Sequence, residues 1–244
     1  MSPSAPTDAV AFHSEIAPDF HASYDVDPNR MARTAVWRQY IAKYVTPGRL
    51  AYDLGCGSGM VTCEIAPYAQ QVLAIDGSDS MLAIAKKTTA ERGFANVAFR
   101  QSRLPIAAPH DLEVADIVIS SSVIEYLDSV EDTLAFIRGI LKPSGILIFS
   151  ISNRDSFKRQ AVKVFNRITG RPRYFGLLKH FLSVNDIREA LEKTGFVLLD
   201  STYFDGRDRF NRLLGSVLPE KHASNMILAV AQRVDAPSAT RNAA

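Results

Sequence analysis

The sequence predicts an α/β fold with a doubly wound, mostly parallel, seven-stranded sheet and helical insertions. Strand-like apolar runs alternate with segments of helical spacing from residue 50 onward, as crossover units require. Almost half of the 244 residues are apolar, which is enough to bury the core of one domain of this kind. The strand-like runs are residues 50–54, 71–75, 97–101, 114–121, 145–151, 196–203 and 225–232.

Serine residues mark the starts of three predicted helices. Ser78 precedes a helical stretch that stops at Gly93, a residue suited to a helix C-terminus. Ser129 and Ser183 each stand three residues before an aspartate, which is the spacing of a capping box. Helices at these places would separate the strands and cover the two faces of the sheet.

The ends of the chain lack a periodic pattern. The first ~25 and the last ~10 residues are polar and rich in Pro and Ala, so we expect loose ends there. We expect an N-terminal segment at 1–28, a main domain at 29–233 and a disordered tail at 234–244. Insertions at 153–182 and 205–224 interrupt the main domain.

Charge and cysteine content argue against several functions. A net charge of +2 is too small to indicate a nucleic-acid-binding protein. Cys56 and Cys63 have no neighbouring histidine or second cysteine pair, so we expect neither disulfides nor a metal site. The sequence shows neither the basic start and apolar core of an export signal nor an apolar run long enough to span a membrane. These observations predict a cytoplasmic protein, with peripheral contact to a membrane as an option.

The segment DLGCGSG, which starts at Asp53, follows the first strand-like run where open parallel sheets bind ligands. Gly55, Gly57 and Gly59 can adopt positive φ and let the backbone approach a ligand closely. The dinucleotide fingerprint would need its third glycine at Met60, and the Walker pattern would need a following Gly-Lys-Ser/Thr. Neither pattern fits. A carboxylate directly before the loop favours a cationic ligand over a pyrophosphate.

This segment resembles the first motif of the class I S-adenosylmethionine-dependent methyltransferases, whose ligand carries an amino group and a sulfonium. Asp76 matches the acidic residue of the family that accepts hydrogen bonds from both ribose hydroxyls. VADIVISSSVIEYL resembles the fourth strand and its substrate-facing loop, and LKPSGILIFSISN resembles the fifth strand. The resemblance implies the Rossmann-like methyltransferase fold and S-adenosylmethionine as the cofactor.

The resemblance also implies further cofactor contacts. The family usually carries an acid after the third strand for the adenine amino group, whereas Ser102 stands here and Gln101 or the backbone near Arg103 are the alternatives. FHSEIAPDFHASYD resembles the N-terminal lid, in which Tyr24 and Arg33 are either ligands of the cofactor carboxylate or ordinary surface residues. The expected cofactor-binding residues are Tyr24, Arg33, Asp53, Gly55, Cys56, Gly57, Gly59, Asp76, Gly77, Met81, Ser102, Arg103 and Ser120.

Several residues could act as a base on the acceptor side. A general base matters only where the acceptor carries a proton near the attacking atom, as a phenol or an ammonium does. Glu125 and Tyr126 follow the fourth strand-like run, and His110 and His180 stand further away in sequence. We take Glu125, Tyr126 and His180 as candidate catalytic residues, with a capping carboxylate or a solvated histidine as the alternative.

Two missing motifs favour a small-molecule acceptor. Family members that methylate adenine or glutamine amides carry Asn/Asp-Pro-Pro-Tyr where this chain has 121–124, and protein arginine methyltransferases carry paired glutamates there. The insertion after the fifth strand resembles that of quinone-biosynthesis O-methyltransferases, which act on a polyprenylated phenol. We expect O-methylation of an apolar or amphipathic acceptor that is lipid-linked or anionic. N- or C-methylation, a non-catalytic S-adenosylmethionine-binding module and a nicotinamide-dependent oxidoreductase are the alternatives.

The first insertion is strongly basic. Residues 153–182 contain eight Lys or Arg and one acid, which gives +7 and leaves −5 for the rest of the chain. A helix at 154–168 would have an apolar side and a basic side, and 205–224 contains a second apolar pattern. Two interpretations are possible. In the first, both insertions pack on the rim of the sheet and their charged residues face water. In the second, they form a lid over an apolar acceptor, and the basic side meets anionic lipid head groups or an anionic part of the substrate. We expect weak contact with an anionic membrane surface through 154–179.

Overall fold

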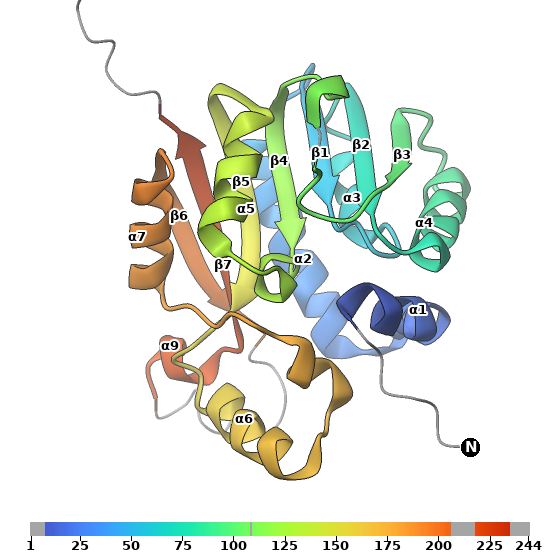
Figure 1. The fold of residues 1–244 in the computed structure, drawn as a ribbon. Coiled ribbons are helices and arrows are strands. Elements are labelled where there is room, and N and C mark those ends of the chain that lie inside the picture. Colours follow the sequence, from blue (N-terminus) through green and yellow to red (C-terminus); the bar gives the residue numbers. More distant parts are fainter. Residues whose placement is uncertain (1–7, 108, 206–217, 235–244) are drawn as a thin grey trace, which may run out of the picture.

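The computed structural model describes residues 8–107, 109–205 and 218–234 (Figure 1). Within these residues seven strands form one sheet of order β3-β2-β1-β4-β5-β7-β6. β7 runs antiparallel to both of its neighbours, and the other pairings are parallel. The strands are β1 (Leu50–Leu54), β2 (Gln71–Asp76), β3 (Val97–Gln101), β4 (Ala115–Ser121), β5 (Leu141–Ser152), β6 (Phe196–Phe204) and β7 (Met226–Arg233).

Helices cover both faces of the sheet, as doubly wound folds require. On one face lie α2 (Pro28–Tyr44), α3 (Met60–Ile65) and α4 (Asp79–Glu91), with Trp37 of α2 almost fully buried. On the other face lie α5 (Val130–Gly139) and α7 (Val184–Lys193). The central strands β1 and β4 are therefore buried on both sides, and their ends form a rigid base for loops.

The N-terminal segment forms α1 (Ala9–Val26), so the expectation of a loose end is wrong for these residues. Asp8 caps the helix by accepting a hydrogen bond of 2.9 Å from the Ala11 amide. Phe12 and Ala17 are buried, and α1 packs against α2 and α4. Polar residues interrupt the stretch, but its apolar residues recur at helical spacing and gain burial by packing.

The first insertion contributes α6 (Phe157–Thr169) and the 3-10 helix η3 (Arg173–Leu177), and α9 (Glu220–Ala223) precedes β7. Figure 1 shows α1, α6 and α9 beyond the carboxyl ends of the parallel strands. The two ends of the insertion meet in a parallel bridge between Asn153 and Leu182, where the Arg154 amide donates to the Leu182 carbonyl at 2.9 Å. The chain thus leaves and re-enters the sheet at one point.

The second insertion falls mostly outside the described residues. The apolar face expected from Phe210, Leu213, Leu214 and Val217 lies there, and so does most of the tail expected at 234–244. Among the residues that the structure describes, none of the helices combines the length and the apolar character that crossing a bilayer demands.

Candidate active site

The glycine loop turns the chain from β1 into α3, with positive φ at Gly55 (73°), Gly57 (52°) and Gly59 (85°). A Cβ atom on Gly55 would lie 2.2 Å from Cγ2 of Val123, so this glycine is required by packing. A Cβ atom on Gly57 would meet nothing within 4 Å among the described residues. Gly57 therefore presents the backbone edge that a ligand can approach.

Asp76 ends β2 opposite the loop. Its Oδ2 accepts a hydrogen bond from the Gly57 amide, and its Oδ1 accepts one from the Ser78 amide, both at 2.8 Å. Burial raises the pKa of this carboxyl, and the two amides oppose the rise by stabilising the charged form. Each oxygen retains a second lone pair, so Asp76 can also accept hydrogen bonds from a pair of hydroxyls.

Asp53 is fully buried at the end of β1. Its Oδ2 accepts a hydrogen bond of 2.6 Å from the Thr62 hydroxyl, and its Oδ1 has no hydrogen-bond partner among the described residues. Burial raises the pKa of Asp53 to about 7, and the nearby charge of Asp76 adds to the rise. An unpaired buried carboxylate oxygen is costly, so the site favours a ligand with a cationic donor.

Three other expected cofactor residues are buried around the loop. Cys56, Met81 and Ser120 are each less than a tenth exposed. The Ser120 hydroxyl donates to the Leu54 carbonyl at 3.3 Å, and burial raises the pKa of the Cys56 thiol, which therefore stays protonated. These side chains shape the walls of the site.

The start of α1 covers the end of β2. A Cβ atom on Gly77 would lie 2.9 Å from Cγ2 of Val10. Arg103, which follows β3, donates at 2.8 Å to Asp8, the N-cap of α1. The Ser102 amide donates to the Asp76 carbonyl at 3.0 Å, which holds the turn after β3 against the end of β2. Ser102 and Arg103 therefore stand beside Asp76, but the Arg103 guanidinium is engaged in holding α1.

Glu125 places a buried carboxyl beyond the end of β4, in the 3-10 helix η2 (Ile124–Tyr126). The residue is 2% exposed, its Oε1 accepts a hydrogen bond of 3.4 Å from Ser152, and its Oε2 has no partner among the described residues. Burial raises the pKa of Glu125 to about 7, although the charges of Arg159 and Arg33 oppose the rise. This carboxyl can therefore exchange a proton near neutral pH.

Arg33 lies close to Glu125 and links three elements. Its Nη2 donates to the Ser122 hydroxyl at 2.9 Å, and its Nη1 is 3.8 Å from Oδ2 of Asp205. Ser122 and Asp205 both have positive φ, at 57° and 65°, although neither is a glycine. Backbone strain of this kind concentrates at functional sites. Tyr24, the other expected lid residue, is an electrostatic neighbour of Arg33.

His13 of α1 is a site residue that the sequence analysis missed. Its ring centroid is 5.4 Å from that of Tyr126, and its Nδ1 is 2.8 Å from the Ala9 carbonyl. Because a carbonyl only accepts, Nδ1 carries the hydrogen, and because burial lowers the pKa of the ring, Nε2 keeps its lone pair near neutral pH. A helical spacing could have revealed this face, which contains His13, Ala17, Phe20 and Tyr24.

Tyr126 and His180 differ in how the structure uses them. Burial raises the pKa of the Tyr126 phenol, which keeps its proton. The His180 Nε2 is 3.0 Å from the Leu127 carbonyl, and the His180 amide donates to the Glu125 carbonyl at 3.2 Å. The His180 ring is thus committed to fixing the turn after η2.

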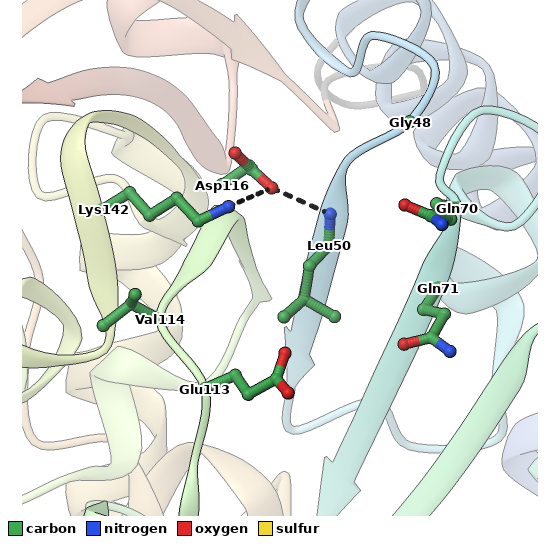
Figure 2. Close-up of a pocket in the computed structure, with 8 residues that line it drawn as sticks. All are labelled: Gly48, Leu50, Gln70, Gln71, Glu113, Val114, Asp116 and Lys142. Atoms are coloured by element: carbon green, nitrogen blue, oxygen red, sulfur yellow. Dashed lines mark hydrogen bonds and ion pairs between the residues drawn. The ribbon is translucent and has the colours of Figure 1, made fainter.

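A hollow of about 610 Å³ lies away from these residues, at the amino ends of β1 and β4 (Figure 2). Its acid Asp116 accepts hydrogen bonds from the Leu50 amide and from Lys142, both at 3.0 Å, so its charge is already paired. None of the site residues expected from the sequence lines this hollow. Ligand binding in sheets of this type occurs at the opposite, carboxyl ends of the strands.

Comparison with known proteins supports the same assignment. Residues 52–149 match the family model described as "Methyltransferase domain". The malonyl-[acyl-carrier protein] O-methyltransferase of Halalkalibacterium halodurans is 32% identical over 113 residues, which is 45% of this chain and 41% of that protein. The ubiquinone biosynthesis O-methyltransferase of Methylococcus capsulatus is 31% identical over 131 residues, 53% of this chain and 52% of that protein. The chain thus spans about half the length of these relatives or less.

Solved structures share the fold at lower identity. Magnesium protoporphyrin IX methyltransferase (ChlM) from Synechocystis PCC 6803, solved with bound S-adenosylhomocysteine, has a TM-score of 0.68 and 17% identity, over 93% of this chain and all of that chain. The [4+2]-cyclase SpnF has a TM-score of 0.69 and 18% identity, over 96% of this chain and 98% of that chain. With the sheet order and the family match, the chain contains a class I S-adenosylmethionine-dependent methyltransferase domain.

Proposed function

We propose that the protein transfers a methyl group from S-adenosylmethionine to an oxygen atom of a small amphipathic acceptor. The observation that carries this proposal is the buried Glu125 carboxyl with its unpaired Oε2. The glycine loop packs against the turn that leads to Glu125, because Gly55 and Val123 are in close contact. A cofactor on the loop and a base on η2 would therefore face the same acceptor.

The described residues fit the cofactor at four places. Asp76 would hold the ribose hydroxyls, the open backbone edge of Gly57 would face the methionine part, and the unpaired Oδ1 of Asp53 would favour its ammonium group. Arg33 would pair with the carboxylate, since guanidinium groups bind carboxylates in a fixed geometry. When bound, the cofactor supplies an electrophilic methyl group next to a sulfonium.

In this proposal Glu125 is the general base. As the acceptor oxygen forms its bond to the methyl carbon and the methyl–sulfur bond breaks to leave S-adenosylhomocysteine, Oε2 would take the hydroxyl proton, while Ser152 holds the other carboxyl oxygen. A pKa near 7 keeps much of the carboxyl ionised at neutral pH. Positioning of the acceptor oxygen supplies a further part of the rate. His13, whose Nδ1 is hydrogen-bonded to the Ala9 carbonyl so that Nε2 can act as an acceptor, is a second candidate for the proton acceptor.

The segments beyond the strand ends would enclose the acceptor. We assign residues 1–28 to a lid and the insertions at 153–182 and 205–224 to a cap on a main domain at 29–233. The outer edge of α6 is apolar and exposed, with Phe157 at 47%, Phe165 at 53% and Ile168 at 79% exposure. Together with Arg167, this edge suits weak contact with the anionic cytoplasmic surface of a membrane, where a lipid-linked acceptor would be held.

Methylation of nitrogen or carbon and cofactor binding without methyl transfer are the alternatives. The [4+2]-cyclase SpnF has the same fold, so the fold alone does not specify methyl transfer. Glu125 favours a protonated nucleophile such as a hydroxyl, since a base has no role for a nucleophile that carries no proton. The relatives that share sequence with this chain are named as O-methyltransferases.

Calorimetry and methyl transfer test the proposal. S-adenosylmethionine and S-adenosylhomocysteine should bind with one site each, whereas NAD should not bind. Labelled methyl from S-adenosylmethionine should then appear as an ether or ester of phenols and carboxylic acids with an apolar tail. Binding without turnover on any such acceptor would leave the cofactor-binding module as the function, and NAD binding would overturn the proposal.

A further inference from the structure

α6 is oriented against the usual rule for amphipathic helices. Its apolar edge faces outward, and Ile168 on that edge is 79% exposed. Its inner edge, which contacts the rest of the protein, contains Arg159 and Lys163, both half-buried. The interpretation in which the apolar edge packs on the sheet and the charges point to water is therefore wrong for this helix.

The inward cations have no acidic partner among the described residues. Arg159 donates from Nε to the Asn225 carbonyl at 3.3 Å and from Nη2 to the Met226 sulfur at 3.1 Å, both weak or neutral acceptors. Its guanidinium lies 5.9 Å from the Phe175 ring centre, and the Lys163 ammonium lies 5.4 Å from that of Phe181. A half-buried cation without a counter-ion is costly, so these groups favour an anion.

Arg159 stands on the acceptor side of the active site. The Met226 sulfur that accepts from Arg159 Nη2 also lies 3.9 Å from the Ser152 hydroxyl, which donates to Glu125 Oε1. Burial raises the pKa of Glu125 and of Tyr126, and the positive charge of Arg159 opposes both rises. Glu125 itself carries the buried, unpaired Oε2. Among the described residues, a cation whose hydrogen bonds go only to neutral acceptors and a carboxyl oxygen without a partner therefore stand on the same side of the site, next to aromatic rings. A ligand that pairs both would carry an anionic group and a hydrogen-bond donor.

We propose that Arg159, assisted by Lys163, binds the anionic group of the acceptor, and that the apolar body of the acceptor lies against Phe175 and Phe181. The substrate class is thus an amphipathic anion with a carboxylate, sulfonate or phosphate group and a hydroxyl that reaches Glu125. This inference rests on the proposed function for the reaction, but the anion site itself is independent of methyl transfer.

A matched pair of fluorescent probes tests the anion site. Anilinonaphthalene sulfonate carries a sulfonate on an aromatic body, and phenylnaphthylamine has the same body without the charge. The sulfonate should bind the wild-type protein saturably, and Arg159→Met should weaken it by about tenfold or more, as loss of a charged hydrogen bond does. Arg167→Met removes the same charge from an exposed position of α6 and should leave the affinity within about twofold.

The neutral probe and a second control variant separate charge recognition at Arg159 from packing and from binding at the outer edge of α6. Phenylnaphthylamine should bind wild type and Arg159→Met alike, whereas equal loss for both probes would mean that Arg159 only supports packing, which overturns the inference.

Ile168→Asn changes the exposed apolar edge of α6. Strong loss of sulfonate binding in this variant would place the probe at that edge and also overturn the inference. The inference is equally overturned if wild type shows no saturable sulfonate binding. S-adenosylmethionine binding is measured on the same samples, and its absence would contradict the proposed function alone.

Discussion

Arg33 of α2 and Ser122 at the end of β4 are joined by a hydrogen bond of 2.9 Å. Ser122 has a φ of 57°, and its amide donates to the Ser150 hydroxyl at 3.0 Å, so the turn is held from two sides. The bond ties the N-terminal helices to the point between β1 and β4 where the strand order reverses. Contacts within the protein therefore hold the Arg33 guanidinium in place without a bound ligand.

Arg33→Met should weaken binding of S-adenosylhomocysteine by roughly tenfold to a hundredfold, because charged hydrogen bonds contribute about 1.5–3 kcal/mol. Methylthioadenosine, which lacks the amino-acid part, should bind both proteins alike in calorimetry. Arg30→Met is the matched control. Arg30 is on the same helix as Arg33, α2, but its guanidinium lies over the Phe20 and Tyr24 rings of α1. Equal losses for the two ligands would contradict a carboxylate contact.

Gly57→Val should mainly affect cofactor binding, whereas Gly55→Val should mainly affect stability. A Cβ atom at position 57 would meet no atom of the described residues within 4 Å, so the variant should fold, at a cost of about 1–2 kcal/mol for positive φ, and lose the cofactor. A side chain at position 55 collides with Val123, so that variant should lose stability first. Thermal unfolding and calorimetry separate the two effects. Wild-type affinity in Gly57→Val would show that the loop does not approach the cofactor.

Asp76→Ala should weaken S-adenosylmethionine binding by about 2–3 kcal/mol, since the carboxylate would accept both ribose hydroxyls. The variant also removes the acceptor of the Gly57 and Ser78 amides, so its unfolding free energy is measured in parallel. A cofactor analogue without ribose hydroxyls should bind wild type and variant equally. If the variant loses as much affinity for this analogue as for the natural cofactor, the ribose contact is refuted.

Glu125→Gln should remove the pH dependence of methyl transfer. The wild-type kcat/KM should rise with pH through about 7, because only the ionised carboxyl accepts a proton. Glutamine keeps the shape but cannot take the proton, so the variant should be slow and flat over pH 5.5–8.5, roughly the range around that pKa. A variant with the wild-type pH profile would show that another group is the base, and His13→Phe would then be the next variant to measure.

The same carboxyl should make the free protein less stable as pH rises. Its folded-state pKa of about 7 lies above the ordinary 4.5, so the folded state binds the proton more tightly than the unfolded state. The free energy of unfolding should therefore fall between about pH 4.5 and 7, by up to roughly 3 kcal/mol. Asp53 shifts in the same direction, so Glu125→Gln should reduce the slope of a urea-derived profile without abolishing it. An unchanged slope would mean that Glu125 has an ordinary pKa.

The outer edge of α6 should bind vesicles that contain anionic lipid. Sedimentation should detect weak binding at low salt and its loss at about 0.5 M salt, where the screening length is a few ångströms. Ile168→Asp should reduce the binding about tenfold, since one buried apolar side chain contributes about 1.5–3 kcal/mol. Thr169→Asp adds the same charge to an exposed neighbour of Ile168 and is the control. Equal effects of the two variants would indicate electrostatics alone, without insertion of the apolar edge.

The sequence predicts the sheet and the cofactor loop because both depend on local patterns. Strand-sized apolar runs and capping serines give the element order, and the glycine spacing after β1 indicates the ligand end. The direction of β7 is not encoded in such patterns, since it depends on which strands pair. The spacing of α6 predicts an apolar edge and a basic edge. Which edge faces inward depends on tertiary contacts with Phe175 and with Asn225, which lies far away in sequence.

The bridge between Asn153 and Leu182 makes the first insertion separable from the sheet. Because the segment begins and ends at adjacent points, another segment with the same two ends could replace it without moving β5 or α7. In the proposed function, natural variation or protein engineering could therefore exchange this segment, and with it the acceptor preference. The residues proposed to bind the methyl donor, at the ends of β1, β2 and β4, would stay in place.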